Sequence, residues 1–369
     1  MEFNLNSKEL EKLLSKVIPA VPTRTPMAIL ENFLFEIEEG KLTVFSTDLE
    51  ISLRSSMKIN SEDKIKIVVP AHLLYDVVRA LSDTQIKFET ETNSKLKLTT
   101  DNGTYSLGFS SPEEFPSPPD VVAEDEINIS GKELKKAIDL TSFAMSKEDM
   151  RPAMTGMLFE FTKEGVNFVS TDGHRLVRYT NKKIKNPREE QFIIPERAIN
   201  VLSKLLTEKE IKATFSKTNV CFTIDDVVFV SRLIAEKYPA YNSVIPMENE
   251  TELKINKNEI LSTVKRMSLF STTNTKQVKF SIKENSLIVA AEDIDSGSSA
   301  KEQVKCEYKG DQMDVGFNTA YVLDILSHIN ENEIVFKLHS PTKACIIEPT
   351  KQKEDEDLML LLMPVRLNG

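Results

Sequence analysis

The stretch "NSKELEKLLSKVI", residues 6–18, has the pattern of an amphipathic helix and occurs in three related forms along the chain. The other two forms are "SGKELKKAIDLTSFAM" at 130–145 and "NKNEILSTVKRMSLF" at 256–270. Leu10, Leu134 and Ile260 align at spacings of 124 and 126 residues, and each form opens with Ser or Asn followed by an acidic residue, a helix-start signal. The sequence therefore predicts three copies of one structural unit.

A second helix is predicted later in each copy. Its three forms are "VVPAHLLYDVVRALSD" at 68–83, "IIPERAINVLSKLLTE" at 193–208 and "GFNTAYVLDILSHINE" at 316–331. Pro70, Pro195 and Asn318 align in these forms, and a Pro is tolerated in the first turn of a helix. Each copy thus supplies two helices.

Strand-like alternation fills most of the remaining sequence. It is visible in "GKLTVFSTDLEISLRSS" at 40–56, "GVNFVSTDGHRLVRYT" at 165–180 and "NSLIVAAEDIDSGSS" at 285–299. Several strands follow each helix, so we expect an α+β fold in which two helices per copy lie on one face of antiparallel sheets, rather than a doubly wound parallel sheet.

Pro-containing stretches close the first two copies. They are "SSPEEFPSPPD" at 110–120 and "IAEKYPAYNSVIP" at 234–246, with Phe115-Pro116 matching Tyr238-Pro239. Together with the length of 369 residues, which exceeds what one hydrophobic core usually supports, they predict three domains. The expected domains are residues 1–125, 126–250 and 251–369.

Composition excludes several classes of protein. The longest strongly apolar run, Leu358 to Val365, is far shorter than the roughly 20 residues of a membrane span. Met1 to Leu10 lack the basic start and apolar stretch of a signal peptide, so we expect a cytoplasmic protein with no membrane partner. Three scattered cysteines, Cys221, Cys306 and Cys345, indicate reduced thiols, and no Cys or His pair has metal-ligand spacing. We expect no metal and no cofactor.

The stretch 168–180, "FVSTDGHRLVRYT", contains reactive residue types but has an internal control. Asp172 aligns with Asp48 in "FSTDLEISLRSS", a copy that lacks the His. An Asp shared by both copies is expected to satisfy backbone donors in a turn. The second copy adds Gly173, His174 and Arg175, for which three interpretations remain: a hydrolase site around Asp172 and His174, a structural turn, or a recognition surface. A hydrolase lacks supporting motifs, since no Gly-x-Ser-x-Gly elbow and no phosphate loop occurs.

The triplication, "STDGHRL" at 170–176 and "MPVRL" at 363–367, in this order and at these distances, resemble the beta subunit of bacterial DNA polymerase III, the sliding clamp. The resemblance covers the whole chain. It implies a non-catalytic processivity factor, in which two chains join head to tail as a ring of six similar domains. Twelve helices would surround duplex DNA, and the sheets would form the outer wall. Implied partners are duplex DNA without sequence specificity, a second copy of the chain, the replicative polymerase catalytic subunit, the clamp loader, repair polymerases and mismatch-repair proteins. ATP would be needed only by the separate loader.

The resemblance also implies a groove that binds short peptides anchored by Leu or Phe side chains. By motif position its residues are Met154, Thr171, Gly173, His174, Arg175, Leu176, Pro239, Val244, Leu361, Met363, Pro364, Val365 and Arg366. Ser243 stands where some family members carry Arg, which predicts one weaker polar wall. The charged stretch "KQKEDEDLMLL" at 351–361 is expected to be a solvated loop that borders the groove.

Charge distribution is consistent with a DNA-binding lining despite the formal net charge of −10. Counted over residues 7–18, 70–82, 131–147, 195–209, 256–270 and 317–329, the six predicted helical stretches hold five more Lys and Arg than Asp and Glu, so the acidic excess lies outside them. A weakly basic lining attracts phosphates without reading bases, which permits sliding. Candidate DNA-facing residues are Lys12, Arg24, Arg79, Lys136, Arg151, Arg197, Lys204, Lys265 and Arg266.

The family resemblance further implies where the two chains meet. Tyr105, Leu107 and Phe109 of one chain would contact Leu269 and Phe270 of the other. The alternating stretch "TYSLGFS" reads as an edge strand, which needs a partner to avoid uncontrolled pairing. A repeat scaffold that binds protein alone, without DNA, remains an alternative from the sequence.

Overall fold

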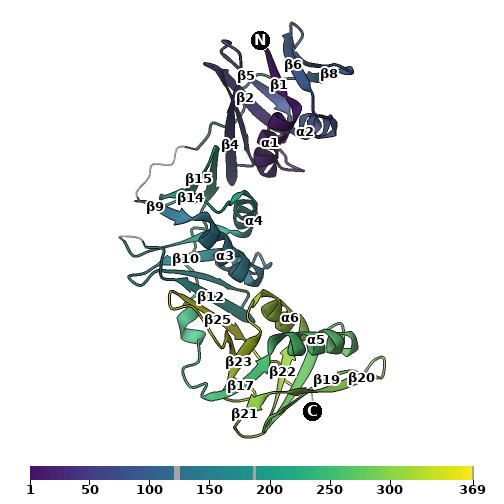
Figure 1. Cartoon of the computed structure of the whole chain (residues 1–369), viewed down its shortest axis with the longest axis vertical. Helices are drawn as coiled ribbons and strands as arrows, with labels where there is room; N and C mark the ends of the chain where they lie inside the picture. The colour runs from purple at the N-terminus through teal and green to yellow at the C-terminus, as the bar shows by residue number, and fades with distance from the viewer. Residues whose placement is uncertain (120–124, 186–187, 368–369) are drawn as a thin grey trace. The chain divides into compact units, whose positions relative to one another are not determined.

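The computed structural model describes residues 1–119, 125–185 and 188–367 (Figure 1). By packing, the chain divides into a first unit, residues 1–134 with 200–233, and a second unit, residues 135–199 with 234–369. The first predicted domain boundary, at 125 and 126, adjoins residues 120–124, which lie outside the described residues. Each unit combines parts of two sequence copies, for a reason that the sheets explain below.

All six predicted helices form. They are α1 (Ser7–Val17), α2 (Ala71–Ala80), α3 (Gly131–Thr141), α4 (Glu196–Leu205), α5 (Lys257–Met267) and α6 (Thr319–His328). The aligned residues Leu10, Leu134 and Ile260 are all fully buried, as the amphipathic pattern requires. Within the units, α1 packs against α2, and α5 packs against α6 (Figure 1). No described helix has both the length and the apolar character needed to cross a membrane.

Asparagine side chains cap the N-termini of three of these helices, α1, α5 and α6. The Asn6 carboxamide oxygen accepts hydrogen bonds from the backbone N–H groups of Lys8 and Glu9. Asn256 accepts from Glu259 N–H in the same way, and Asn318 accepts from Ala320 N–H. These bonds satisfy donors that the first helical turn leaves unpaired. The cap signal in the sequence therefore marks real helix starts.

Twenty-five named strands surround the helices in the described part of the chain. The first copy contains β1 (Glu2–Asn6), β2 (Asn32–Glu38), β3 (Lys41–Thr47), β4 (Ile51–Lys58), β5 (Ile65–Pro70), β6 (Gln85–Glu91), β7 (Lys95–Thr100) and β8 (Gly103–Gly108). The second contains β9 (Asp125–Ser130), β10 (Gly156–Phe161), β11 (Val166–Thr171), β12 (Arg175–Asn181), β13 (Glu190–Pro195), β14 (Glu210–Phe215), β15 (Asn219–Ile224) and β16 (Val227–Arg232). The third contains β17 (Thr251–Asn256), β18 (Gln277–Lys283), β19 (Ser286–Asp293), β20 (Ser298–Lys305), β21 (Glu307–Tyr308), β22 (Met313–Asn318), β23 (Glu333–Leu338), β24 (Cys345–Pro349) and β25 (Glu356–Leu362).

The structural repeat is shorter than the sequence repeat. The helices begin every 60 to 65 residues, and each is preceded by one strand and followed by at least three. Each sequence copy thus holds two strand–helix–strands halves. The halves exchange strands: β1, before α1, pairs with β6, after α2, whereas β5, before α2, pairs with β2, after α1. The same exchange occurs in the other copies, so neither half forms its sheets alone.

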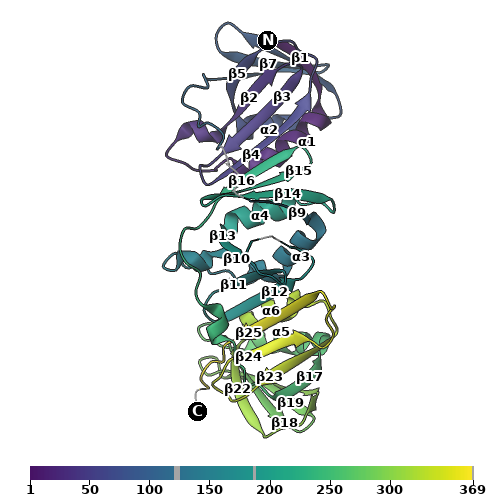
Figure 2. The same cartoon turned by 90° about the vertical axis from the view of Figure 1, so that its left-hand side faces the viewer.

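Sheets continue from one copy into the next. In the first unit, β4 pairs with β16 in an eight-stranded sheet of order β5-β2-β3-β4-β16-β15-β14-β9 (Figure 2). In the second unit, β12 pairs with β25 in a nine-stranded sheet of order β13-β10-β11-β12-β25-β24-β23-β17-β21. All ladders are antiparallel, so the predicted α+β fold with antiparallel sheets is confirmed. The central copy belongs to both units because its two sheets are shared with different neighbours.

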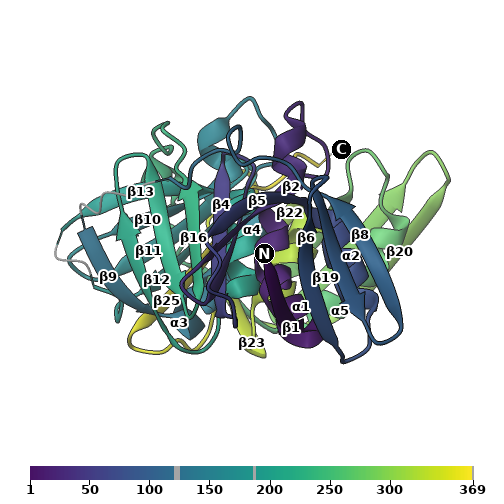
Figure 3. The same cartoon turned by 90° about the horizontal axis from the view of Figure 1, so that it is seen from above.

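Two further sheets have four strands each. The margin strands are β1 and β8 in the sheet β1-β6-β7-β8, and β20 and β22 in the sheet β20-β19-β18-β22. Figure 3 shows β8 and β20 each at the outer side of its own sheet. β8 and β20 occupy the same position in the repeat as β4 and β12. Unlike β8 and β20, the strands β4 and β12 pair with a strand of the next copy.

The join between the first two copies also holds a polar contact. Asp226, in the turn between β15 and β16, accepts hydrogen bonds from Lys16 Nζ of α1 at 2.5 Å and from Ser55 Oγ of β4 at 2.6 Å. Burial raises the pKa of the Asp226 carboxyl, but these hydrogen bonds outweigh burial and hold the pKa below its usual value. The carboxylate is therefore ionised when it makes this contact.

Replacing Asp226 by Asn is expected to destabilise the protein by about 1 kcal/mol at pH 7, because the half-exposed pair with Lys16 is lost. The folded-state pKa is depressed, so this contribution is present above about pH 4 and disappears as the pH falls through the folded value. Thermal melting between pH 3 and 7 measures the difference. Asp225→Asn, which removes only the exposed contact with Lys209, is the matched control. A loss of stability in Asp226→Asn that persists unchanged at pH 3 contradicts this account.

Candidate functional site

Asp172 organises the turn between β11 and β12. Its Oδ1 accepts the backbone N–H groups of His174 and Arg175, both at 2.9 Å. Its Oδ2 accepts from Arg175 Nε at 3.1 Å. Both oxygens are thus engaged away from the His174 ring, which instead stacks on Tyr321 with a centroid distance of 5.7 Å. The turn interpretation of this Asp is confirmed, and the arrangement contains no Asp–His pair of the kind a hydrolase needs.

The aligned turn in the first copy is built in the same way. Asp48 Oδ1 accepts the N–H groups of Glu50 and Ile51, and Thr47 Oγ1 accepts from Leu49 N–H. Leu49 adopts φ +77° where the second copy has Gly173 at φ +87°. A left-handed backbone is strained for Leu and unstrained for Gly. The turn geometry therefore belongs to the repeat, and the second copy differs in side chains.

Arg175 is held inside the protein. Its Nη1 donates to Asp324 Oδ2 of α6 at 2.6 Å, and its Nη2 donates to the Phe143 carbonyl at 2.9 Å. The guanidinium lies over the rings of Phe143 and Tyr321, 5.2 and 4.8 Å from their centroids, and the side chain is only 9% exposed. Arg175 was expected to offer donors to a ligand; the structure uses those donors to connect β12 to α6.

A groove of about 770 Å³ opens beside this turn. It is lined by Arg151, Met154, Thr171, Gly173, His174, Arg175, Leu176, Pro239, Ala240, Tyr241, Ser243, Val244, Ile245, Pro246, Thr342, Lys343, Ala344, Leu361 and Met363. Leu176 of β12 pairs with Leu361 of β25, so the floor of the groove is the seam between the second and third copies. Val244 and Met363 keep 54% and 40% of their surface exposed, which leaves apolar surface available for a ligand.

Buried tyrosines support the groove from below. Tyr238 packs in the apolar cluster with Leu176 and Leu361, and Tyr241 donates a hydrogen bond from its hydroxyl to Glu160 Oε2 at 2.5 Å. Burial raises the pKa of both phenols, and for Tyr241 the Glu160 carboxylate raises it further. Both rings stay neutral and serve as a rigid base rather than as acids.

Of the thirteen residues predicted for the groove, ten lie together in its lining of nineteen residues. They are Met154, Thr171, Gly173, His174, Arg175, Leu176, Pro239, Val244, Leu361 and Met363. Pro364, Val365 and Arg366 are not in the lining. The chain turns away after Met363, because Val365 N–H donates to the Gly316 carbonyl and the Arg366 carbonyl accepts from Gln277 Nε2.

Two cations of the groove were missed. Arg151, predicted to face DNA, lies in the groove, and its Nη1 is 3.0 Å from where a Cβ on Gly173 would stand. Lys343 comes from the loop before β24, and no motif in the sequence marks it as a groove residue. The charged part of the stretch 351–361 does not border the groove: residues 351–357 lie at the opposite end of β25 from Leu361, where Lys136 contacts Glu356.

The remaining predicted DNA-facing residues fall into two groups. Lys136 and Arg266 are ion-paired, with Glu356 and with Glu302 respectively, and Arg79 contacts Asp76 at 3.4 Å. The side chains of Arg197, Lys12, Arg24, Lys204 and Lys265 are exposed. Among the described residues, the last four have no carboxylate within 4 Å. Those four are the cations most available to a phosphate.

The residues predicted to join two chains lie in or directly after β8 and in the short turn that packs against β19 and β20. Tyr105 is in β8, Phe109 directly follows it, and both are half-buried, whereas Leu107 is buried in its own sheet at 3% exposure. Leu269 and Phe270 form the short 3₁₀ turn after α5, and Leu269 is 80% exposed. Leu107 therefore has no surface to offer a partner, while Leu269 has most of its side chain free.

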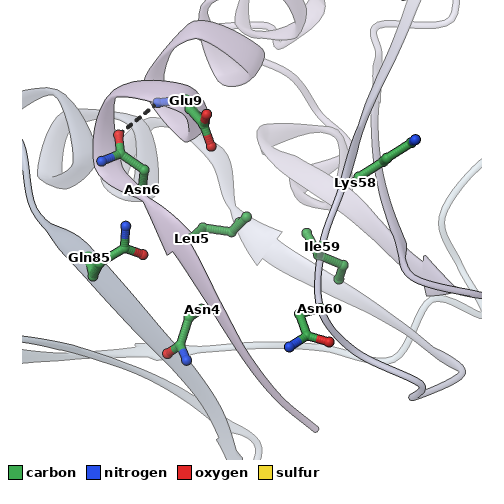
Figure 4. Close-up of a pocket in the computed structure, with 8 residues that line it drawn as sticks. All are labelled: Asn4, Leu5, Asn6, Glu9, Lys58, Ile59, Asn60 and Gln85. Atoms are coloured by element: carbon green, nitrogen blue, oxygen red, sulfur yellow. Dashed lines mark hydrogen bonds between the residues drawn. The ribbon is translucent and has the colours of Figure 1, made fainter.

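A second pocket, of about 620 Å³, lies in the first unit (Figure 4). It is lined by Asn4, Leu5, Asn6, Glu9, Lys58, Ile59, Asn60 and Gln85. The close-up shows the amides spread around an open gap, and the Asn6 oxygen is already engaged in capping α1. These side chains do not converge on a common point. In the ranges that the structure describes, no group of three or more His, Cys, Asp or Glu side chains has metal-site geometry.

Arg175→Ala is expected to destabilise the protein by about 3 kcal/mol, because it leaves the Asp172 carboxylate, whose side chain is only 14% exposed, without its guanidinium and removes the link to α6. Arg178→Ala is the matched control on the same strand, since its pair with Asp357 is partly exposed and is expected to cost less than about 1 kcal/mol. Urea unfolding of both variants measures the difference. Equal losses for the two variants contradict the structural role of Arg175.

The chain matches known proteins along its whole length. Three family models match in order: the N-terminal domain of the DNA polymerase III beta subunit at residues 1–119, its central domain at 128–240 and its C-terminal domain at 242–366. Among curated proteins, the beta sliding clamp of Haemophilus influenzae is 28% identical and that of Pseudomonas aeruginosa is 27% identical, each over the full length of both chains.

Solved structures agree with these matches. The DNA polymerase III subunit beta of Pseudomonas aeruginosa superposes with a TM-score of 0.94 at 27% identity. The sliding clamp of Bartonella birtlesii bound to griselimycin superposes with a TM-score of 0.93 at 29% identity. In both cases all of this chain and all of the solved chain are covered.

Proposed function

The chain belongs to the DNA polymerase III beta-subunit family, the sliding clamps, and from that premise we propose how its own residues perform the work of a clamp. Its function is that of a non-catalytic processivity factor in DNA replication, with DNA and a polymerase as partners. We propose that two chains close head to tail into a ring of six domains, divided near residues 125 and 250 in each chain. Enclosure then retains the protein on DNA while weak contacts allow sliding.

One observation supports the ring: β8 and β20 lie at sheet margins, whereas the strands that correspond to them in the repeat are paired. Within the chain, β4 pairs with β16 and β12 pairs with β25, and each pairing extends a four-stranded set into a continuous sheet. Only β8 and β20 lack such a partner among the corresponding strands of the described chain. Pairing β8 of one copy with β20 of the other uses both margins and closes the assembly, since two identical head-to-tail contacts satisfy both chains. The exposed Leu269 is proposed to pack beside this seam, together with Phe270, Tyr105 and Phe109.

Ser106→Pro is expected to convert the dimer into a monomer. Phe109 N–H points toward Ser94, so by alternation the N–H of Ser106 points outward from β8. Proline removes that outward donor and leaves the inward bonds to β7 intact. Light scattering at micromolar concentration should give the 41.7 kDa chain mass, against twice that mass for the unchanged protein and for the control Ser106→Thr.

The same pair of variants tests retention on DNA. The control, loaded onto a nicked circular plasmid by a clamp loader, should stay bound in high salt and leave after linearisation, whereas Ser106→Pro should not be retained. A monomeric unchanged protein, or retention that does not depend on circular DNA, rules out the ring.

DNA contact is proposed for the exposed, carboxylate-free cations Lys12, Arg24, Lys204 and Lys265. Three of them lie on helices, and the helical stretches are basic although the chain is acidic. Charges of this kind hold phosphates loosely and in no fixed register, as sliding requires. Lys136, Arg151 and Arg266 are not included, because the first and last are neutralised by carboxylates and Arg151 lies in the groove.

Replacing Lys12, Lys204 and Lys265 together by Ala is expected to lower the slope of log affinity against log salt for duplex DNA by about 2 to 3 units, since each phosphate contact contributes about 0.9. The control is Lys163→Ala/Lys217→Ala/Lys283→Ala, which changes three exposed lysines on strands and turns. Fluorescence anisotropy over a salt series gives both slopes. Equal slopes for the two triple variants remove the helical lysines from the DNA interface.

The groove is proposed to hold short peptide segments of the polymerase, the clamp loader, repair polymerases and mismatch-repair proteins. Its apolar floor, Leu176 and Leu361, and the exposed Val244 and Met363 suit Leu or Phe anchors. Methionines adapt to different anchors, which fits a surface shared among several partners. We also propose that the protein is cytoplasmic, because the DNA of a bacterial cell is replicated there.

A further inference from the structure

Within the described residues, the groove is lined without a single acidic side chain. Its charged or ionisable members are the basic residues Arg151, His174, Arg175 and Lys343, alongside the neutral Tyr241. Arg175 is committed to Asp172, Asp324 and the Phe143 carbonyl, so it offers little to a ligand. The cations that remain for a peptide are Arg151 over the turn and Lys343 on the wall that precedes β24.

The wall formed by residues 239–246 carries no cation. Ser243 occupies it, and its hydroxyl donates back to the Ala240 carbonyl at 2.7 Å. The wall at Thr342 and Lys343 therefore supplies positive charge that the Ser243 wall lacks. A carboxylate in a bound peptide would be drawn toward Lys343 by charge complementarity.

Lys343 already has a carboxylate partner at the rim. Its Nζ lies 3.0 Å from Glu248 Oε2, and the two side chains are 50% and 71% exposed. The hydrogen bond from Lys343 holds the pKa of the Glu248 carboxyl below its usual value. Because both groups are open to water, this ion pair is weak and exchanges readily with another carboxylate.

We propose that Lys343 is a specificity-determining residue of the groove, which selects peptides carrying an Asp or Glu beside their apolar anchors, and that Glu248 is an internal counter-ion which the peptide carboxylate displaces. This inference rests on the proposed peptide-binding function. Glu248 satisfies Lys343 when the groove is empty and competes with acidic ligands. A neutral peptide leaves the Lys343–Glu248 ion pair in place, so Lys343 does not increase its affinity.

The test uses full-length protein and fluorescein-labelled synthetic hexapeptides with one Leu and one Phe anchor. Each peptide has a partner that differs only by Asn for Asp, and every non-anchor position is tested in turn. Fluorescence anisotropy should show that at least one Asp peptide binds about 5-fold more tightly than its Asn partner, the range expected of a partly exposed charge pair. Lys343→Met, which keeps the apolar stem, should abolish that preference and leave Asn peptides unaffected.

Glu248→Gln gives the second, opposite signature. It should tighten binding of the preferred Asp peptide and leave its Asn partner unchanged, because only the acidic ligand competes with Glu248. The control Glu250→Gln, two residues away and outside the groove lining, should change neither. The coupling between Lys343→Met and Asp→Asn, measured as a double-mutant cycle, isolates the pair from general effects on the groove.

Three other results of these binding measurements would contradict the proposal. If each Asp peptide binds as tightly as its Asn partner, and Met363→Asp abolishes the binding of both, the specificity of Lys343 is overturned and the groove function is retained. An Asp preference that survives Lys343→Met assigns the charge recognition to another cation and overturns the inference as well. Failure of all peptides to bind the unchanged protein overturns the groove function and this inference with it.

Discussion

Pairing between the edges of β-strands determines how the copies of this chain are joined. An unpaired strand margin presents a row of backbone donors and acceptors that water alone must satisfy, and it invites uncontrolled association. The chain meets this constraint twice by joining sheets between successive copies, at β4 with β16 and at β12 with β25. The same constraint acting on β8 and β20 is the physical basis of the proposed ring.

The candidate groove follows from one of these seams. Its floor exists because Leu176 and Leu361, far apart in the sequence, are brought side by side by the β12–β25 ladder. Arg175 then ties the start of β12 to α6, so the turn that forms one wall of the groove is also part of the join between copies. A residue that looks like a ligand donor is in fact structural support, while the cations open to a ligand, Arg151 and Lys343, come from loops on either side.

Ion pairs formed in the folded chain, rather than its net charge, determine which cations are available to bind DNA. The helices are basic within an acidic chain, yet Lys136 and Arg266 are neutralised by Glu356 and Glu302 of neighbouring strands. A count of charges along helices overestimates the positive surface, because it cannot include carboxylates that only the folded chain brings near. The exposed cations without such partners are fewer, which suits weak contact with DNA rather than tight binding.

The six helices, the antiparallel α+β class and the triplication could be predicted from the sequence, because helix caps and apolar periodicity act over a few residues and can be read from one stretch at a time. The family resemblance, carried by short motifs, named ten residues that share the groove lining. The sequence did not show the exchange of strands within each copy, the half-length repeat, the internal use of Arg175, or the positions of Arg151 and Lys343 in the groove. Backbone N–H and C=O groups are alike at nearly every residue, so which distant edges pair, and which side chains those pairings bring together, is settled only when the whole core is packed.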